Sequence, residues 1–197
     1  MKRSSAWLLV IMATIGITAV GAFAASVHLK NKPPLTFTDN TGPAPSANLT
    51  LSADGALTGL GGGDVVITLT ASANPTGQCC NPSGECKVPG HNPAPVQVTG
   101  ALAIPAAKIK NGNVSFGVDT KAPQTPIPNA PDCSNASWTE NITDLVFTKA
   151  TITVFQPAII DSNGNIVDPN TGAAAQDVFD ITCNLSGVDG GLKASCP

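Results

Sequence analysis

The sequence contains few charged and few aromatic residues. Charged residues make up 12% of its 197 positions, aromatic residues make up 4%, and tyrosine is absent. No cluster of lysine and arginine along the chain is available to neutralise phosphates, which argues against a nucleic-acid partner. The formal net charge is mildly negative, and we interpret it as a feature that favours solubility.

Histidine and glutamate are scarcer still, which argues against catalysis. His91 is the only histidine well inside the chain, and no Gly-x-Ser-x-Gly elbow accompanies it, so a Ser–His–Asp triad has no specific support. Glu85 and Glu140 are the only glutamates, and nothing in the sequence brings them together as a glycosidase pair requires. We therefore expect no enzymatic activity; a secreted hydrolase is the less favoured alternative.

A long apolar run occurs only at the start of the chain. Lys2 and Arg3 precede an apolar stretch from about residue 6 to residue 20, and the A-x-A exit Ala22–Ala24 follows. The pattern predicts a secretory signal peptide over residues 1–24, cleaved before Ala25. The run is shorter than the about 20 residues of a membrane helix, so we expect no membrane span after cleavage. We expect a secreted protein, extracellular or periplasmic. Loss of Lys2 and Arg3 would change its formal net charge from −3 to −5.

All six cysteines follow the predicted leader. An even number of cysteines in an oxidising compartment predicts disulfides. Cys79 and Cys80 are adjacent, and a bond between neighbours would close a strained ring, so we expect them to face different partners. The sequence leaves 15 connectivities open. Our working hypothesis pairs Cys80 with Cys133, Cys79 with Cys86, and Cys183 with Cys196.

Short alternating apolar segments separated by turn residues recur along the chain. In residues 64–71, apolar and polar side chains alternate with the two-residue period of a half-buried strand. Asn111-Gly112 and Asn163-Gly164 each predict a hairpin turn. Further strands are predicted at 48–52, 96–101, 107–109, 114–118, 142–155 with a bend near Lys149, 159–160, 166–167 and 178–185, and around Leu192.

This pattern predicts an all-β fold, a single antiparallel β-sandwich stapled by disulfides. An immunoglobulin-like arrangement is the first choice and a jelly roll the second. The sandwich is expected over residues 48–197, after a loose N-terminal segment at 25–47 with at most one edge strand near Leu35–Thr38. Residues 74–95 are interpreted as a long stapled loop, and the proline-rich stretch 121–131 as an extended connection.

One segment resembles a calcium loop. Asp161, Asn163, Asn165 and Asp168 place oxygen side chains at intervals, although Ile166 stands where an EF-hand loop needs glycine. A hairpin tip explains the same residues, because Asn-Gly adopts positive φ readily. We therefore expect no cofactor, with calcium as the alternative.

The segment from Cys79 to His91 is the second candidate site. Cys79, Cys80, Cys86 and His91 could hold zinc or copper. Their spacing matches no standard zinc pattern, so we favour bridged cysteines with His91 as a surface residue. Trp138 could be a platform for sugar stacking, but a structural tryptophan that leans on a disulfide is the favoured interpretation.

Several motifs occur together along the chain: Gly59–Thr70, Cys80-Asn-Pro, Pro89–Pro93, Ile109–Val114, Ala130–Cys133, Trp138–Asp144 and Phe147–Val154. Taken together, they resemble a family of small secreted bacterial proteins that has no established function. The resemblance covers roughly residues 57–156 in matching order. It implies that the positions of Cys80 and Cys133 recur in the family and pair with each other, that Cys79 and Cys86 form an added local bridge, and that His91 has no essential role.

The expected function follows from these features. We expect an exported, non-catalytic β-sandwich with a structural, binding or assembly role at the cell surface or in an extracellular matrix. Its partner would be a protein or a cell-surface polymer. A secreted metal-binding or carbohydrate-binding protein is the alternative.

Overall fold

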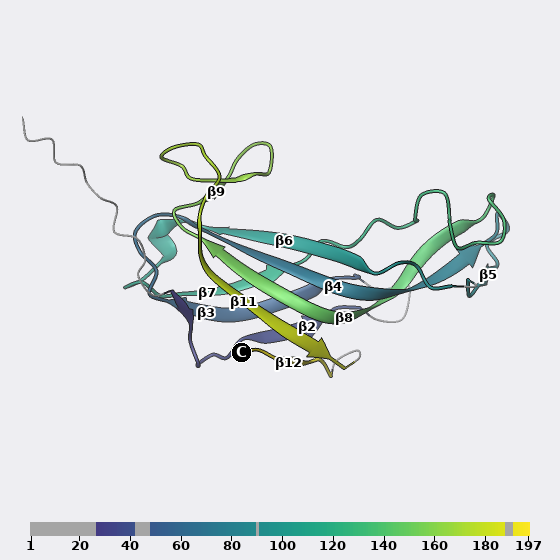
Figure 1. Ribbon diagram of the computed structural model, residues 1–197, viewed down its shortest axis with the longest axis horizontal. Coiled ribbons are helices and arrows are strands. Elements are labelled where there is room, and N and C mark those ends of the chain that lie inside the picture. Colours follow the sequence, from purple (N-terminus) through teal and green to yellow (C-terminus); the bar gives the residue numbers. More distant parts are fainter. Residues whose placement is uncertain (1–26, 42–47, 90, 188–190) are drawn as a thin grey trace, which may run out of the picture.

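The computed structural model describes residues 27–41, 48–89, 91–187 and 191–197; the predicted leader lies outside these ranges. The described residues form an all-β structure with one short 3-10 turn (Figure 1). None of their helical segments is long and apolar enough to cross a bilayer. The elements in chain order are β1 (His28–Leu29), β2 (Thr36–Asp39), β3 (Leu51–Thr58), β4 (Val65–Cys80), β5 (Cys86–Lys87), β6 (Val96–Ile104), η1 (Ala106–Lys108), β7 (Val114–Asp119), β8 (Thr139–Phe155), β9 (Ile159–Ile160), β10 (Ile166–Val167), β11 (Asp177–Ser186) and β12 (Lys193–Ser195).

Two antiparallel sheets pack face to face (Figure 1). In the smaller sheet, β3 pairs with β7 and also with β1 and β2. In the larger sheet the order is β12-β11-β8-β4, and β6 and β5 both pair with β4. A separate hairpin, β9–β10, projects from one end. The predicted all-β, disulfide-stapled sandwich is confirmed, and the immunoglobulin-like and jelly-roll arrangements stay predictions.

The core lies between the two sheets and follows the alternation of the strands. In β4, odd-numbered residues from Ile67 to Cys79 are buried, whereas the even-numbered ones are exposed or half-buried. In β8 the buried residues switch twice between even and odd positions. Ile152 and Ala150 are buried first, then Phe147 and Leu145, and then Ile142. Each change coincides with a register shift in its pairing with β4, since an extra residue in one strand moves the following side chains to the other face.

One of these shifts lies where the sequence predicted a bend. It skips Thr148, next to Lys149, and a bulge bends a strand at that point. Both predicted hairpins are also confirmed. Asn111 and Gly112 have φ of 50° and 72°, as a type I′ turn requires. Asn163 and Gly164 lie between the paired strands β9 and β10.

Four segments differ from the prediction. The strand expected at 48–52 is β3, which begins at Leu51 and continues to Thr58. The stapled loop expected at 74–95 begins only after Cys80, because β4 stays paired with β8 to its end. The strand expected at 107–109 is the 3-10 turn η1, which follows Pro105. The segment expected to be loose at 25–47 belongs to the sandwich over its described part, since β1 and β2 pair with β3 and Phe37 lies in the core.

Candidate functional site

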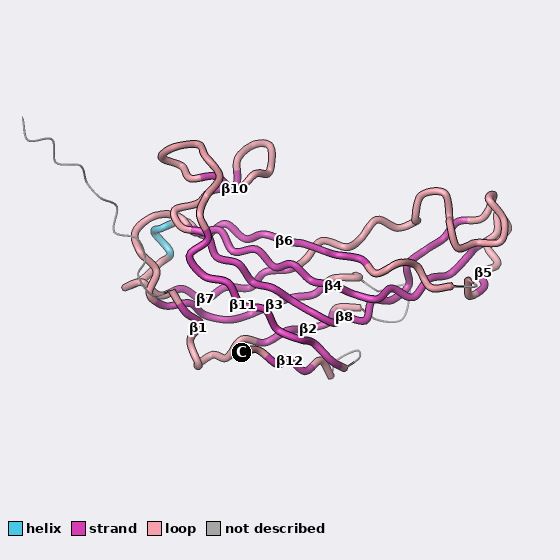
Figure 2. The backbone as a smooth tube through the Cα atoms, in the orientation of Figure 1, coloured by secondary structure: helices cyan, strands magenta, loops and turns pink. Residues whose placement is uncertain are grey.

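The paired ends of β4 and β8 run past the other strands and form one end of an elongated molecule (Figure 1). Pairing between β6 and β4 stops at Ala73, whereas pairing between β4 and β8 continues to Cys80 and Thr139. Two loop segments complete this region (Figure 2): residues 120–138, and residues 88–89 with 91–95. We call the region formed by the strand ends and these loops the stapled end.

Two disulfides hold the stapled end together, and their pairing corrects the hypothesis. Cys79 is bonded to Cys133, and Cys80 to Cys86. The predicted pairs Cys80–Cys133 and Cys79–Cys86 are wrong, because the alternation along β4 puts Cys79, and not Cys80, on the buried face. Cys79 is buried, whereas Cys80 lies directly opposite Cys86 of β5.

The remaining cysteine predictions are confirmed. The third bridge joins Cys183 to Cys196, as expected. No described cysteine is free, so Cys79, Cys80 and Cys86 offer no thiolate to a metal, and His91 is exposed. The zinc or copper site considered for this segment is therefore not formed by these cysteines.

A groove of about 620 Å³ lies between the two loop segments of the stapled end. Its surface is mainly apolar, and Asp132 is its only ionisable residue. Pro93 packs so closely on β4 that a Cβ at Gly77 would lie 2.9 Å from its ring, so glycine is needed there. We call this surface the proline groove; its lining residues are Pro93, Ala94, Pro95, Val96, Gln97, Pro123, Gln124, Ile127, Pro128, Pro131, Asp132 and Ile142.

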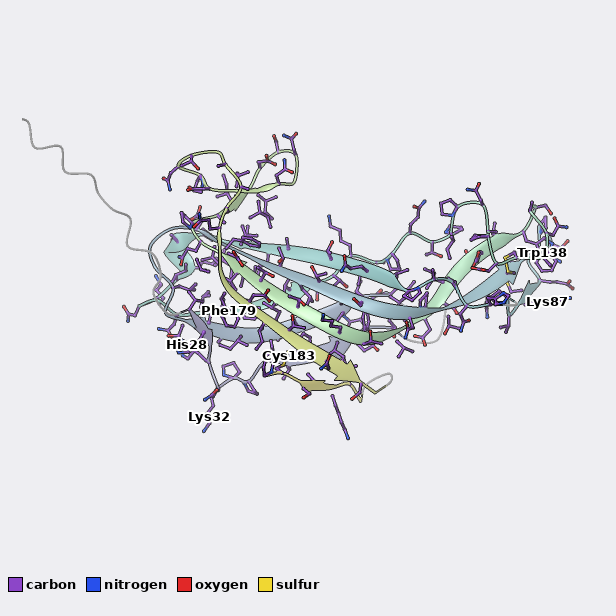
Figure 3. The ribbon with its side chains drawn as sticks, in the orientation of Figure 1. His28, Lys32, Lys87, Trp138, Phe179 and Cys183 are labelled. Atoms are coloured by element: carbon purple, nitrogen blue, oxygen red, sulfur yellow. A yellow bond between two sulfur atoms is a disulfide. The ribbon has the colours of Figure 1, made fainter. Side chains whose placement is uncertain are left out.

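A second hollow of about 320 Å³ lies on the other side of Asp132. Trp138, Lys87, Cys79 and Cys133 line it, and the labelled side chains of Trp138 and Lys87 lie together at this end of the molecule (Figure 3). Trp138 is half-buried beside the Cys79–Cys133 disulfide, so the favoured structural interpretation fits its position. Trp138 is also partly exposed to this hollow, which Lys87 and Asp132 line as well.

Glu140 is fully buried at the stapled end. Its backbone oxygen accepts a hydrogen bond from Ile127, and its Oε2 accepts one from the amide of Asp132 at 3.2 Å. Its Oε1 has no hydrogen-bond partner among the described residues. Glu85 is exposed and contacts Asn81 instead, so the two glutamates have separate surroundings.

The calcium candidates lie around the β9–β10 hairpin. The carboxylate of Asp161 accepts hydrogen bonds from the amides of Asn163 and Asn165, both at 2.8 Å, and from the side chain of Asn165. These bonds, led by the Asn165 amide, lower the pKa of Asp161 below its ordinary value of 3.8. Asp168 accepts from the amide and the side chain of Asn170 instead. Each carboxylate thus closes its own turn, and the described residues contain no cluster of three or more acidic, histidine or cysteine ligands.

Sequence reasoning named the cysteines and Trp138 but missed the proline groove. The groove joins residues 93–97 to residues 123–132, and nothing local in either segment marks the other as its neighbour. The density of proline in both segments was the available signal, because rigid extended chains often cover a sheet edge. A comparison with protein-family models finds no match, and neither does a comparison with curated protein sequences.

Proposed function

We propose that this chain is an exported, non-catalytic binding protein of the cell surface or extracellular matrix, and that its proline groove holds an apolar segment of a partner protein. The observation that carries the proposal is the groove itself, one wall of which, residues 123–132, is joined to β4 by the Cys79–Cys133 disulfide at the next residue. Five prolines line it, so little conformational freedom is lost when a partner binds.

The chemistry of the groove supports binding over catalysis. Asp132 is the only ionisable residue in its lining, and no nucleophile stands beside a general base there. No aromatic ring lines the groove, so its complement is an apolar peptide segment and not a stacked sugar. Three disulfides support the export part of the proposal, since such bonds persist in oxidising compartments.

Intact mass of the purified protein tests export. We expect a chain that begins at Ala25 and lacks two hydrogens for each of the three bridges. Full-length, reduced protein in the cytosol would contradict the proposal.

Paired substitutions test the groove. Ile127→Asp places a charge in the groove, whereas Ile160→Asp places the same charge on the exposed β9 hairpin. We expect the Ile127 variant to move from the envelope or matrix fraction of producing cells into the medium, and the Ile160 variant to stay. Pro128→Asp, at an exposed groove position, repeats the test should Ile127→Asp disturb folding. Equal retention of all three variants would refute the groove as the binding surface.

Carbohydrate binding at Trp138 is the second candidate function. The observation that favours it is a half-buried indole in a hollow that also holds Lys87, Asp132 and Ser134. The only other tryptophan, Trp7, lies in the predicted leader, so the emission of the mature protein would report on Trp138 alone. A saturable change in this emission with added oligosaccharides would support the alternative, and an unchanged spectrum would exclude it.

A further inference from the structure

Three lysines from two distant segments of the chain line one hollow at the end of the molecule opposite the stapled end. Lys30 follows β1, Lys108 ends η1, and Lys110 lies two residues further along. The short helix marks this end, and β5 marks the other (Figure 2, Figure 1). The hollow measures about 370 Å³ and is also lined by Asn113, Ser115, Ala56 and Val114. We call it the lysine hollow.

Hydrogen bonds hold the backbone segments that carry the three lysines. The amide of Lys108 donates to the carbonyl of Pro105 at 2.9 Å. The amide of Lys30 donates to the carbonyl of Ala56 at 2.8 Å. Lys110 and Asn113 exchange two bonds of 2.9 Å across the Asn111-Gly112 turn. At the start of η1, the amide of Ala106 donates to the carboxylate of Asp64 at 2.8 Å. The hollow is therefore preformed, and only the lysine side chains must adjust when a ligand binds.

The charge of the hollow is unusual for this protein. No carboxylate lines it, and the three ammonium groups have no ion-pair partner among the described residues. Of the ten lysines and arginines in the chain, two belong to the predicted leader, so this one site holds three of the remaining eight. Like charges brought together in a concave site repel one another unless an anion lies between them.

We propose that the lysine hollow binds a phosphate group of a phosphodiester-linked surface polymer. Lysine binds phosphate as a point charge. The Asn113 side chain donates one of its two amide hydrogens to the carbonyl of Asn111 at 2.7 Å, so its second hydrogen and the exposed Ser115 hydroxyl are the further donors. The hollow is larger than a single phosphate, so the adjoining polyol or sugar units of the polymer fit beside it. The inference goes beyond the proline groove and does not depend on it, because the two sites lie at opposite ends.

Titration calorimetry on the mature protein at low salt tests the proposal, with a synthetic poly(glycerol phosphate) oligomer as the probe. The test variant is Lys30→Gln/Lys108→Gln/Lys110→Gln. The control variant, Lys121→Gln/Lys149→Gln/Lys193→Gln, removes the same charge from exposed sites away from the hollow. We expect the test variant to bind at least about tenfold more weakly and the control variant to change by less than about twofold. Affinity should also fall as salt is added.

A single substitution guards against a misfolded triple variant. Ser115→Ala removes one exposed hydroxyl from the hollow and is expected to weaken binding by about threefold. Equal weakening by the two triple variants would overturn the proposal, since it would show attraction to net charge alone. If inorganic phosphate bound as tightly as poly(glycerol phosphate), the hollow would not recognise a polymer. If polygalacturonate, a carboxylate polymer, bound as tightly, phosphate would not be the recognised group. Tighter binding of single-stranded DNA would assign the hollow to nucleic acid instead.

Discussion

At Gly100 the two sheets approach more closely than any side chain allows. A Cβ at this position would lie 1.8 Å from the carbonyl oxygen of Asp119, the last residue of β7. Just beyond, the amide of Lys121 donates to the carbonyl of Thr99 at 2.9 Å, which joins the edge of β6 to the chain leaving β7. Glycine at position 100 therefore allows one side of the sandwich to close.

The substitution Gly100→Ala tests this contact. Because the atom in the way belongs to the backbone, β7 must shift, and we expect a loss of about 3 kcal/mol or more in the free energy of unfolding. Gly62→Ala is the control, since a Cβ there meets nothing within 4 Å. Urea denaturation of both variants measures the difference, and an equal effect of the two substitutions would contradict the account.

The length of β4 shows how far an alternating sequence pattern predicts a strand and where such a prediction fails. The alternation of polar and small residues continues through Thr76 and Gln78, so the full strand was visible in principle. The prolines and cysteines of residues 74–95 predicted a loop there and ended the predicted strand early. Proline is tolerated at position 75 because β6 has already ended at that point, which leaves one edge of β4 without a ladder partner. Whether β4 has a free edge at Pro75 depends on where β6 ends, and the local sequence around Pro75 does not show this.

Removing the two bridges of the stapled end separately tests their unequal roles. Cys79→Ala/Cys133→Ala opens a link across 54 residues, whereas Cys80→Ala/Cys86→Ala opens one across 6. On a chain-entropy basis we expect losses of about 4 and about 2 kcal/mol in the free energy of unfolding, respectively. Guanidinium denaturation under non-reducing conditions compares them. A larger loss for the second pair would mean that the first does not anchor the 120–138 segment.

The β9–β10 hairpin should respond to acid independently of the core. The pKa of Asp161 is lowered in the folded hairpin, so its stabilising contribution is complete above the ordinary value of 3.8. The contribution is lost as the pH falls through the lowered value of the folded state. NMR shifts of the Asn163 and Asn165 amides should move in this range. Asp161→Asn should abolish the response, and the Asn111-Gly112 hairpin, which has no such carboxylate, should show none.

Across the whole molecule, the two ends are stabilised in different ways. The middle is covered by two sheets, with Leu51, Ile67 and Ile152 fully buried between them. At the stapled end, loops and disulfides replace the second sheet. Sequence patterns predicted the middle well, because each strand carries its own alternation. The proline groove and the lysine hollow come from segments far apart in the chain, so they become visible only after folding.

Hydrogen exchange with and without a reducing agent tests this difference. After reduction we expect amides in residues 123–133 and 139–142 to exchange at least about tenfold faster, because the bridge that holds these loops is gone. Amides of β4 between Val65 and Ala73 should keep their protection, since β6 and β8 flank them. Uniform loss of protection along the chain would show that the disulfides stabilise the molecule as a single unit.

Because Cys79 and Cys80 are adjacent in β4, the pairing of their disulfides depends on the register that β4 had when the bonds formed. A slip of one residue would exchange the two faces of the strand. Oxidation at that moment would trap Cys80 with Cys133 and Cys79 with Cys86. This isomer has the same mass as the native form, so only fragment analysis distinguishes the two. The fraction of this isomer in an oxidised preparation would thus measure how often β4 was out of register when its disulfides formed.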